Sequence, residues 1–283
     1  MDISVIIPVS KDIRLLRCID SIDVDAEIVV VFNNEPLKEL IQKAQVDQRV
    51  EAIVLPDRGC NLAQVFNIGI KQAKFSKVLL ANSDCIFVKH QIAKTKRLLT
   101  EFEVVKGSIC FESNSLMTRL VAELRFLFHE IFSEKKALFG PGLAFHRSII
   151  KQIGGYYFDE DMGWGEDGEL SQRIYASDLK VYYLDEPLLA HPPESICHDL
   201  RIAYKIGYGE WIQHSKQGIG LNMAIATDLL NLFVDRKKRF RRALTHGGLA
   251  LAGYLLLWKL ISHAGYYKHA LELKRKEGEY VDN

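Results

Sequence analysis

Two adjacent acids follow a tryptophan that stands between two glycines, in the stretch GWGEDGEL. Glu166 and Asp167 are neighbours, so their side chains point in different directions and can serve different roles. A carboxylate in a partly apolar site beside an aromatic ring has a raised pKa, which suits a general base. Trp164 offers a flat apolar face for the C–H face of a sugar ring, and Gly163 and Gly165 would let the loop close over a ligand. An ordinary helix start explains the acids through the helix dipole, but it gives no reason for the tryptophan.

An aspartate and a histidine end two apolar stretches that are far apart in the sequence. Asp84 ends SKVLLANSD, and His191 ends KVYYLDEPLLAH and is followed by two prolines. A carboxylate oxygen and a neutral imidazole nitrogen are both ligands for a divalent cation, and hard cations accompany nucleotide phosphates. Each residue also has an ordinary alternative, since Asp84 can cap the next helix and a lone histidine is often structural.

The elements that must position these residues alternate between strands and helices as far as Asp84. The runs ISVIIPVS and AEIVVVFNN are typical of buried strands, the first on both faces, and VEAIVLP and SKVLLANSD predict a third and a fourth strand, with helical patterns between them. This alternation predicts βαβ units and a mostly parallel sheet, in which ligands bind beyond the carboxyl ends of the strands. The polar residues at those ends are Ser10, Asn33, Asn34, Asp57, Arg58, Asn82, Ser83 and Asp84.

Beyond Asp84 the alternation loosens. We expect a helix in KHQIAKTKRLLTEF and a strand in VVKGSICF. An amphipathic helix follows at residues 116–132, which either covers the sheet or shapes an acceptor side. A strand and short helix then lead to the GWGED loop, its helix, and the strand that ends at His191. The turn PVSKD after the first strand lacks the glycines of a dinucleotide-binding fingerprint.

Composition excludes several classes of protein. The chain has 283 residues and a net charge of +1, so no overall field attracts nucleic acid, and we expect no nucleic-acid partner. Its five cysteines are scattered without a CxxC pair, which favours reduced thiols in a cytoplasmic setting. The N-terminal stretch MDISVIIPVSKD is typical of a strand and not of a signal peptide.

The C-terminal third has a different character, and we expect a domain boundary near residue 195, with one domain at 1–195 and a helical extension at 196–283. Within 236–258 a basic cluster, RKKRFRR, precedes an apolar run that contains a tryptophan. The run is too short to span a bilayer, but the combination suits a helix lying on an anionic membrane surface. The alternative is a helix packed on the domain with a solvated basic turn before it.

These motifs, in this order, resemble the inverting glycosyltransferases of family 2, which have the GT-A fold. The resemblance runs from residue 3 to about 193 through SVIIPV, EIVVVFNN, FNIGIKQA, NSD, GPGLAFHRSIIKQIGGYYFDEDMGWGEDGELSQRI and KVYYLDEPLLAHPP. GWGED is especially similar to galactosyl- and N-acetylhexosaminyltransferases that use UDP-sugars. The resemblance implies an α/β fold of GT-A type. This is a Rossmann-like, mostly parallel mixed sheet flanked by helices, here with a helical C-terminal extension.

The resemblance also implies roles for particular residues. Asp84 and His191 would bind Mn²⁺ or Mg²⁺, Asp167 would be the base, and Glu166 would support acceptor binding. Trp164, Gly163 and Gly165 would form the sugar platform. The nucleotide side would include Pro8, Val9, Asn33, Asn82 and Ser83, to which we add Arg58 because it follows the third strand.

The implied function is transfer of a sugar, with inversion, to a hydroxyl group. The donor would be a UDP-hexose or UDP-N-acetylhexosamine, and the acceptor a glycan or lipid-linked molecule at the inner face of the cell membrane. Two departures stand out: Phe32 to Glu35 replace the acids that usually end the nucleotide strand, and Asn82 replaces the first acid of the metal motif. They leave open an inactive sugar-binding or scaffold protein of the same shape. A sugar-phosphate nucleotidyltransferase fits less well, because PVSKDIR lacks a glycine-rich triphosphate loop.

Overall fold

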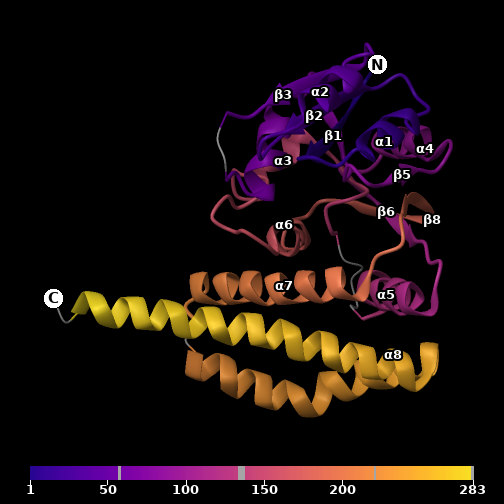
Figure 1. Ribbon diagram of the computed structural model, residues 1–283. Helices are drawn as coiled ribbons and strands as arrows, with labels where there is room; N and C mark the ends of the chain where they lie inside the picture. Colours follow the sequence, from indigo (N-terminus) through magenta and orange to yellow (C-terminus); the bar gives the residue numbers. More distant parts are fainter. Residues whose placement is uncertain (57–58, 133–137, 220, 282–283) are drawn as a thin grey trace. The chain divides into compact units, whose positions relative to one another are not determined.

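The computed structural model describes residues 1–56, 59–132, 138–219 and 221–281, with the backbone alone described at 221–236 and 273–281. The chain divides into two compact units (Figure 1). The first comprises Met1–Glu112 and Lys135–Pro192, and the second comprises Ser113–Glu134 and Pro193–Asn283. The segment Ser113–Glu134, which the sequence analysis placed in the first domain, therefore belongs to the second unit.

A mixed sheet forms the centre of the first unit. Within the described residues it has eight strands in the order β3-β2-β1-β4-β7-β6-β8-β5. β1 to β4 are mutually parallel, β7 runs antiparallel to β4 and β6, β8 is parallel to β6, and β5 is antiparallel to β8. The expected mixed α/β sheet is thus confirmed. The strands are Ile3–Val9 (β1), Glu27–Phe32 (β2), Val50–Val54 (β3), Lys77–Leu80 (β4), Ile86–Phe87 (β5), Val104–Phe111 (β6), Leu143–His146 (β7) and Val181–His191 (β8).

Helices cover both faces of this sheet, which explains why its central strands are apolar on both sides. Ile3, Val5 and Ile7 of β1 pack in one core cluster with residues of α1, α2 and α4. Ile6 belongs to a second cluster, which contains residues of α3 and α6. The helices of this unit are Leu15–Asp20 (α1), Lys38–Ala44 (α2), Leu62–Gln72 (α3), Gln91–Leu98 (α4) and Glu166–Tyr175 (α6), with a short 3₁₀ helix at Arg147–Lys151 (η2).

The second unit consists of packed helices. Its elements are Leu116–Phe126 (α5), a π-helical turn at Leu127–Ile131 (η1), Ile196–Lys216 (α7) and Leu221–Val281 (α8). The backbone of α8 leaves helical geometry at Gly247 and Gly248, so α8 is two helices joined at a kink. Leu124 and Leu127 share a buried cluster with Leu251 and Trp258. The apolar face of residues 116–132 is therefore a packing face, as one of the two alternatives held, but the surface that it packs against is α8 and not the sheet.

One stretch of α8, Lys237–Glu272, is long and apolar enough by length and composition to cross a membrane. It extends well beyond the apolar run that the sequence analysis had judged too short. The same composition is found in the core helices of soluble proteins, and one face of this stretch packs against α5 and α7.

A buried charge connects the three helices of the second unit. Asp199 of α7 is fully buried and pairs with Arg125 of α5. The Tyr254 hydroxyl of α8 donates a hydrogen bond of 2.6 Å to the same carboxylate. Burial raises the pKa of Tyr254, and the bond to Asp199 adds to the rise, so the phenol stays protonated and keeps donating. A buried carboxylate is tolerated only with such partners, so these contacts fix the register of the bundle.

Two glycines allow α7 and α8 to touch backbone to backbone (Figure 1). A Cβ atom on Gly207 of α7 would lie 1.8 Å from the carbonyl oxygen of Ser262, and one on Gly265 would lie 2.0 Å from that of Tyr204. Neither backbone atom can move aside as a flexible side chain could. The two positions therefore require glycine.

We predict that Gly207→Ala destabilises the second unit by about 1–3 kcal/mol, because the added methyl group must force the helices apart. Gly253→Ala is the matched control, since a Cβ atom there meets nothing within 4 Å. Alanine at that helical position should instead stabilise by about 0.5–1 kcal/mol. Urea denaturation followed by circular dichroism measures both. Equal midpoints for the two variants would contradict the close helix crossing.

Candidate active site

The parallel strands β1, β2 and β4 end at the same edge of the sheet, and polar residues follow each of them. Two backbone hydrogen bonds extend the ladder past the strand ends: Asn33 N–H donates to the Val9 carbonyl at 2.8 Å, and Ala81 N–H donates to the Ile6 carbonyl at 3.0 Å. The segments that begin at Asn33 and Asn82 are therefore held beside the end of β1. This edge is where a parallel sheet binds ligands.

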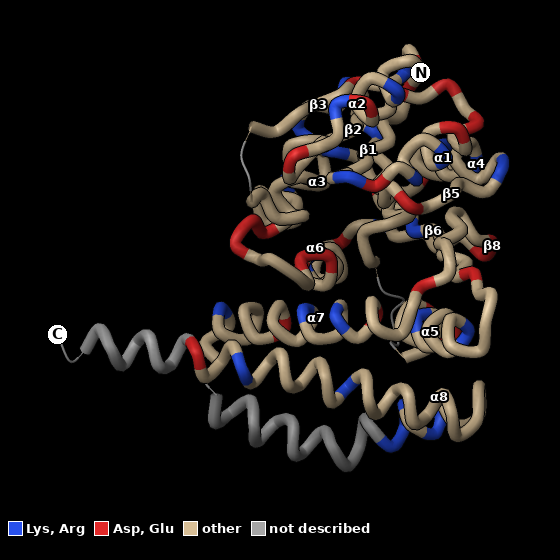
Figure 2. The backbone as a smooth tube through the Cα atoms, in the orientation of Figure 1, with Lys and Arg blue, Asp and Glu red and all other residues tan. Residues whose placement is uncertain are grey.

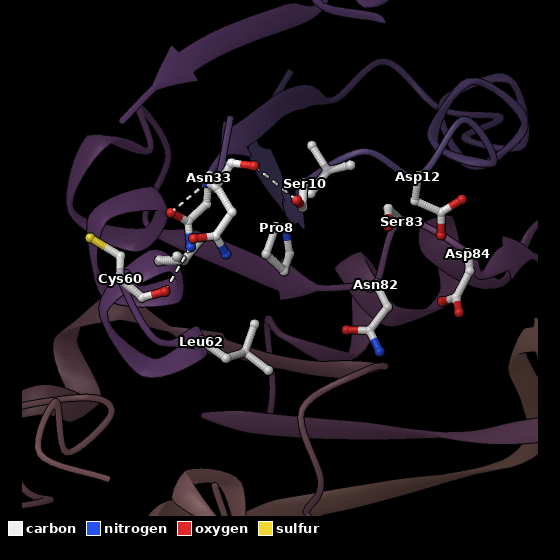
Figure 3. A pocket seen from close by; sticks show the side chains of 12 residues that line it. Pro8, Ser10, Asp12, Asn33, Cys60, Leu62, Asn82, Ser83 and Asp84 are labelled. Atoms are coloured by element: carbon white, nitrogen blue, oxygen red, sulfur yellow. Dashed lines mark hydrogen bonds between the residues drawn. The ribbon is translucent and has the colours of Figure 1, made fainter. Parts of the chain in front are cut away.

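A cavity of about 390 Å³ opens at this edge (Figure 3). Asn33 and Cys60 lie at one end of it, and Asn82 and Asp84 at the other. Of the residues that the sequence analysis assigned to the nucleotide and metal sides, all line this cavity except His191, which lies beside Asp84, and Arg58, which lies outside the described residues. Those lining the cavity are Pro8, Val9, Asn33, Asn82, Ser83 and Asp84.

Asn33 shapes one end of the cavity through its side-chain amide. The amide nitrogen donates to the Cys60 carbonyl at 2.7 Å, and the amide oxygen accepts from Asn34 N–H at 2.8 Å. Asn34 and Glu35 then adopt positive φ angles of 55° and 57°, a turn that the side chain of Asn33 supports. An amide can donate and accept in this way, whereas an ionised acid at this position could only accept.

Asp84 and His191 meet at the other end of the cavity. β5 follows Asp84 directly, and its Ile86 pairs with Ala190, the residue before His191. The Nε2 atom of His191 lies 3.4 Å from Oδ2 of Asp84, and both side chains are largely buried. The Nδ1 atom of His191 lies 2.8 Å from the Pro192 carbonyl, which accepts its proton and leaves Nε2 facing the carboxylate.

This pair fits the chemistry of a divalent cation. A carbonyl-anchored imidazole presenting Nε2 beside a carboxylate oxygen is a common arrangement of metal ligands. Among the described residues, Cys85 completes a group of three potential ligand atoms, all within 4.8 Å of one another. Burial raises the pKa of the Cys85 thiol well above its ordinary value, so Asp84 and His191 are the better donors.

Two charged residues near Asp84 were missed by the sequence analysis. Arg14 makes a bidentate pair with Asp12, at 2.9 and 2.7 Å, and its guanidinium also lies 3.5 Å from Oδ2 of Asp84. Burial alone would raise the pKa of Asp84, but the hydrogen bond and charge of His191 and the charge of Arg14 lower it below its ordinary value. Asp84 is therefore an anion throughout the neutral range. The charged run SKDIR directly after β1 was the available signal.

The carboxylate pair of the GWGED loop lies at the first turn of α6. Gly165 precedes the helix with φ 82°, a left-handed conformation that glycine adopts without strain. Glu166 is buried, whereas Asp167 is half-buried. Asp167 Oδ2 accepts from Gly140 N–H at 3.3 Å, and its Oδ1 accepts from Gly168 N–H at 2.8 Å.

The two carboxyl groups titrate differently. Burial raises the pKa of Glu166 to about 8, and the charge of Asp167 adds to this rise. Burial also raises the pKa of Asp167, but the N–H groups of Gly140 and Gly168 and the charge of Lys106 oppose it. Because a charge on one carboxyl disfavours a charge on the other, the pair gives up its two protons in separate steps and holds a single proton between them. This arrangement suits Asp167 as a base and Glu166 as a hydrogen-bond donor.

A short loop connects the two halves of the site. Gly142 N–H donates to the carbonyl of Leu80, the last residue of β4, at 2.8 Å. Two residues earlier, Gly140 N–H donates to Asp167. The loop 140–142 therefore ties the carboxylate pair to the strand that leads to Asn82 and Asp84.

α6 is fixed to the rest of the first unit by other polar contacts. Arg173 pairs with Glu169 one turn away and donates to the carbonyls of Ile153 and Tyr156. From α3, the buried amide of Asn67 donates to the Phe158 carbonyl at 2.8 Å and accepts from Phe158 N–H at 3.0 Å. These bonds hold both ends of the segment that leads into the GWGED loop.

Trp164 and its two glycines lie in the loop before α6. Gly163 and Trp164 are half-buried. In the described part of the chain, the cavity is lined by other residues, so Trp164 is placed beside the carboxylate pair and not among the nucleotide-side residues.

We predict that Glu166 makes the free energy of unfolding depend on pH between about 4.5 and 8. Its carboxyl keeps a proton in the folded state that the unfolded chain releases, so stability falls as pH rises through this window. Glu166→Gln should leave stability unchanged at pH 4.5 and raise it at pH 8.5, by on the order of a few kcal/mol. Urea titrations at the two pH values measure the difference. Parallel pH profiles for wild type and variant would contradict the buried, protonated state of Glu166.

The sequence matches no family model and no curated protein. Among solved structures, the chain resembles S. aureus TarS 1-349 with a TM-score of 0.54 and 15% identity, over 98% of this chain and 92% of that one. Structures of TarS 1-349 with UDP-GlcNAc and with UDP give TM-scores of 0.53 at the same identity and coverage. A longer TarS structure is covered over 54% of its chain. The chain therefore has the GT-A-like α/β fold that the sequence analysis expected.

Proposed function

We propose that this protein is a glycosyltransferase that moves a sugar from a nucleotide-sugar donor to a hydroxyl group, with inversion. The observation that carries the proposal is the cavity at the carboxyl edge of the sheet. It ends at Asp84, which lies 3.4 Å from His191 in an arrangement that suits a divalent cation, and the loop 140–142 ties the same edge to a half-buried carboxylate, Asp167. The TarS structures with UDP-GlcNAc and UDP support a UDP-hexose or UDP-N-acetylhexosamine donor.

The two ends of the cavity suit the two ends of such a donor (Figure 3). Near Asn33, the cavity is walled by Pro8, Leu62 and Val65, whose apolar surfaces suit a nucleoside. At the opposite end, Asp84 and His191 would hold Mn²⁺ or Mg²⁺. A bound ion would offset the charge that develops on the departing diphosphate.

In this proposal, the carboxyl groups in the first turn of α6 act on the acceptor. Asp167 takes the proton of the acceptor hydroxyl, whose oxygen forms a bond to the anomeric carbon while the bond from that carbon to the diphosphate oxygen breaks. Attack from the side opposite the leaving group inverts the configuration. Protonated Glu166 donates a hydrogen bond to the acceptor, and Trp164 provides an apolar surface for a sugar ring.

We predict that Asp167→Asn lowers acceptor-dependent sugar transfer by about 100-fold or more, because an amide cannot take the proton. Donor binding should be retained, since Asp167 does not line the cavity. Nucleotide release is measured with UDP-, GDP- and dTDP-sugars, with and without Mn²⁺, and donor binding by calorimetry. Asp178→Asn, an exposed acid just beyond α6, is the control and should behave as wild type.

Other outcomes of this assay would identify the alternatives. Donor binding without any nucleotide release would favour an inactive sugar-binding protein. Pyrophosphate release from a nucleoside triphosphate in the presence of a sugar phosphate would favour a nucleotidyltransferase. Unchanged transfer by Asp167→Asn would remove this residue as the base.

We also propose that the second unit binds an anionic membrane surface, at the cytoplasmic face where lipid-linked acceptors would be available. After the kink in α8, large apolar side chains are exposed at Leu249, Leu256, Leu257 and Leu260. Before the kink, basic residues are exposed, at Lys237, Lys238 and Arg241 (Figure 2). Exposed leucines next to a basic cluster suit insertion among acyl chains combined with attraction to anionic headgroups.

We predict that the protein floats with vesicles containing phosphatidylglycerol more than with phosphatidylcholine vesicles. The double change Leu256→Gln with Leu260→Gln should weaken binding about tenfold or more, because two exposed apolar side chains are lost. Leu37→Gln with Val46→Gln, at exposed apolar positions of the first unit, is the matched control. Absence of wild-type protein from floated vesicles would refute the membrane proposal while leaving the transferase proposal intact.

A further inference from the structure

A lysine lies buried within the sheet of the first unit. Lys106 is in β6, paired with Leu143 of β7 on one side and with Tyr183 of β8 on the other. Only 4% of its surface is exposed. Lysine is rarely buried to this extent, because its ammonium group loses its hydration, so the position calls for specific partners.

The ammonium group of Lys106 reaches the loop 140–142. It donates a hydrogen bond to the carbonyl of Pro141. Gly142 follows with φ 77°, and a Cβ atom there would lie 3.5 Å from the lysine Nζ and 3.0 Å from the Gly107 carbonyl. Gly107 N–H in turn donates to the Gly142 carbonyl at 2.9 Å. The loop is therefore pressed closely onto the strand that carries Lys106.

The same loop holds Asp167 from its other side. Gly140 N–H donates to Oδ2 of Asp167 at 3.3 Å, one residue before the carbonyl that accepts from Lys106. Lys106 and Asp167 are thus connected through the loop, which accepts a hydrogen bond from the lysine and donates one to the carboxylate. The lysine is also close enough for its charge to act on the carboxylate.

We propose that Lys106 is a positioning residue for Asp167, fixing the 140–142 loop that holds the carboxylate and supplying the positive charge that keeps this carboxylate ionised. The proposal rests on the proposed function only in naming Asp167 as the base. The hydrogen-bond chain itself does not depend on which reaction the site performs.

The positive charge of Lys106 opposes the effects that disfavour a negative charge on Asp167. Burial disfavours a negative charge at the first turn of α6, and the charge of Asp167 further disfavours a second one on Glu166. The groups that act in the opposite direction on Asp167 are three backbone N–H groups, those of Gly140, Gly168 and Asp167 itself, and the ammonium of Lys106. Of these, only the lysine carries a full charge. Without it, the pKa of Asp167 rises and the base holds its proton to higher pH.

Two substitutions separate the charge of Lys106 from its hydrogen bond. Lys106→Met removes both at similar length, and Lys106→Gln removes the charge while keeping a donor. Lys77→Met is the matched control, because Lys77 is a largely buried strand lysine whose partners are Asp2 and the Lys96 carbonyl. Each variant is measured as the full chain, by kcat and KM from pH 5.5 to 9.

We expect Lys106→Met to lower kcat about tenfold at pH 6 and less than about threefold at pH 8, with KM for the donor unchanged, since a shift of one pH unit changes ionisation tenfold. Lys106→Gln should show the same pH dependence with a smaller loss at pH 8. Lys77→Met should follow the wild-type profile. A uniform loss at every pH, or a rise in donor KM with an unchanged profile, would overturn the proposal in favour of a structural or donor-binding lysine.

A second measurement needs neither donor nor acceptor. The amide signals of Gly140 and Gly168 report on Asp167 and can be followed by NMR as pH changes in the free protein. We expect their transition to move to higher pH in Lys106→Gln and to stay in place in Lys77→Met. An unmoved transition would overturn the proposal even if the enzyme is active. A moved transition in a protein with no transferase activity would uphold the role of the lysine while the proposed function fails.

Discussion

The parallel alignment of β1, β2 and β4 is the constraint on which the site depends. Because the three strands point the same way, the chain leaves each of them at one edge of the sheet, and each exit carries polar residues that begin the next connection. β7 runs the opposite way between β4 and β6, so its beginning, and not its end, lies at that edge. The loop 140–142 precedes this antiparallel strand, and its Gly140 and Gly142 N–H groups donate to Asp167 and to the last residue of β4.

The local electrostatics favour the charged form of Asp84 and the neutral form of Glu166. At Asp84, the contacts with His191 and Arg14 outweigh burial and favour the charged form of the carboxyl group. At Glu166, burial and a neighbouring acid favour the neutral form. Carboxyl groups whose pKa values are moved apart in this way can take separate parts in one reaction, one as a constant anion beside a cation and the other as a proton carrier. At Asp167, burial raises the pKa, and backbone donors and the charge of Lys106 act against that rise.

Much of the first unit could be predicted from the sequence, because its determinants are local. An uninterrupted β-branched run such as ISVIIPV specifies a strand buried on both faces, and the polar residue that follows marks its end. The meeting of Asp84 and His191 was predictable only through the order of motifs, since β5 and β8 pair across more than a hundred intervening positions.

The features that were missed depend on partners distant in sequence. The amphipathic pattern at 116–132 shows that a helix has an apolar face, but nothing in it states whether a sheet or α8 will cover that face. Lys106 was passed over within a strand that was itself predicted correctly. A lysine in a run of buried residues was the available signal, and its meaning depended on Pro141 and Asp167, which other elements bring to it.

The replacement of an acid by Asn82 is best understood together with Arg14. An amide oxygen is a weaker ligand than a carboxylate, so one acid fewer lowers the attraction of this end of the cavity for a divalent cation. It also removes a negative charge that would repel a diphosphate. Arg14, held by Asp12, places a guanidinium 3.5 Å from Asp84 at the same end. A guanidinium is suited to phosphate oxygens, so under the proposed function the absence of one acid would make this end of the cavity more receptive to a nucleotide diphosphate before any ion binds.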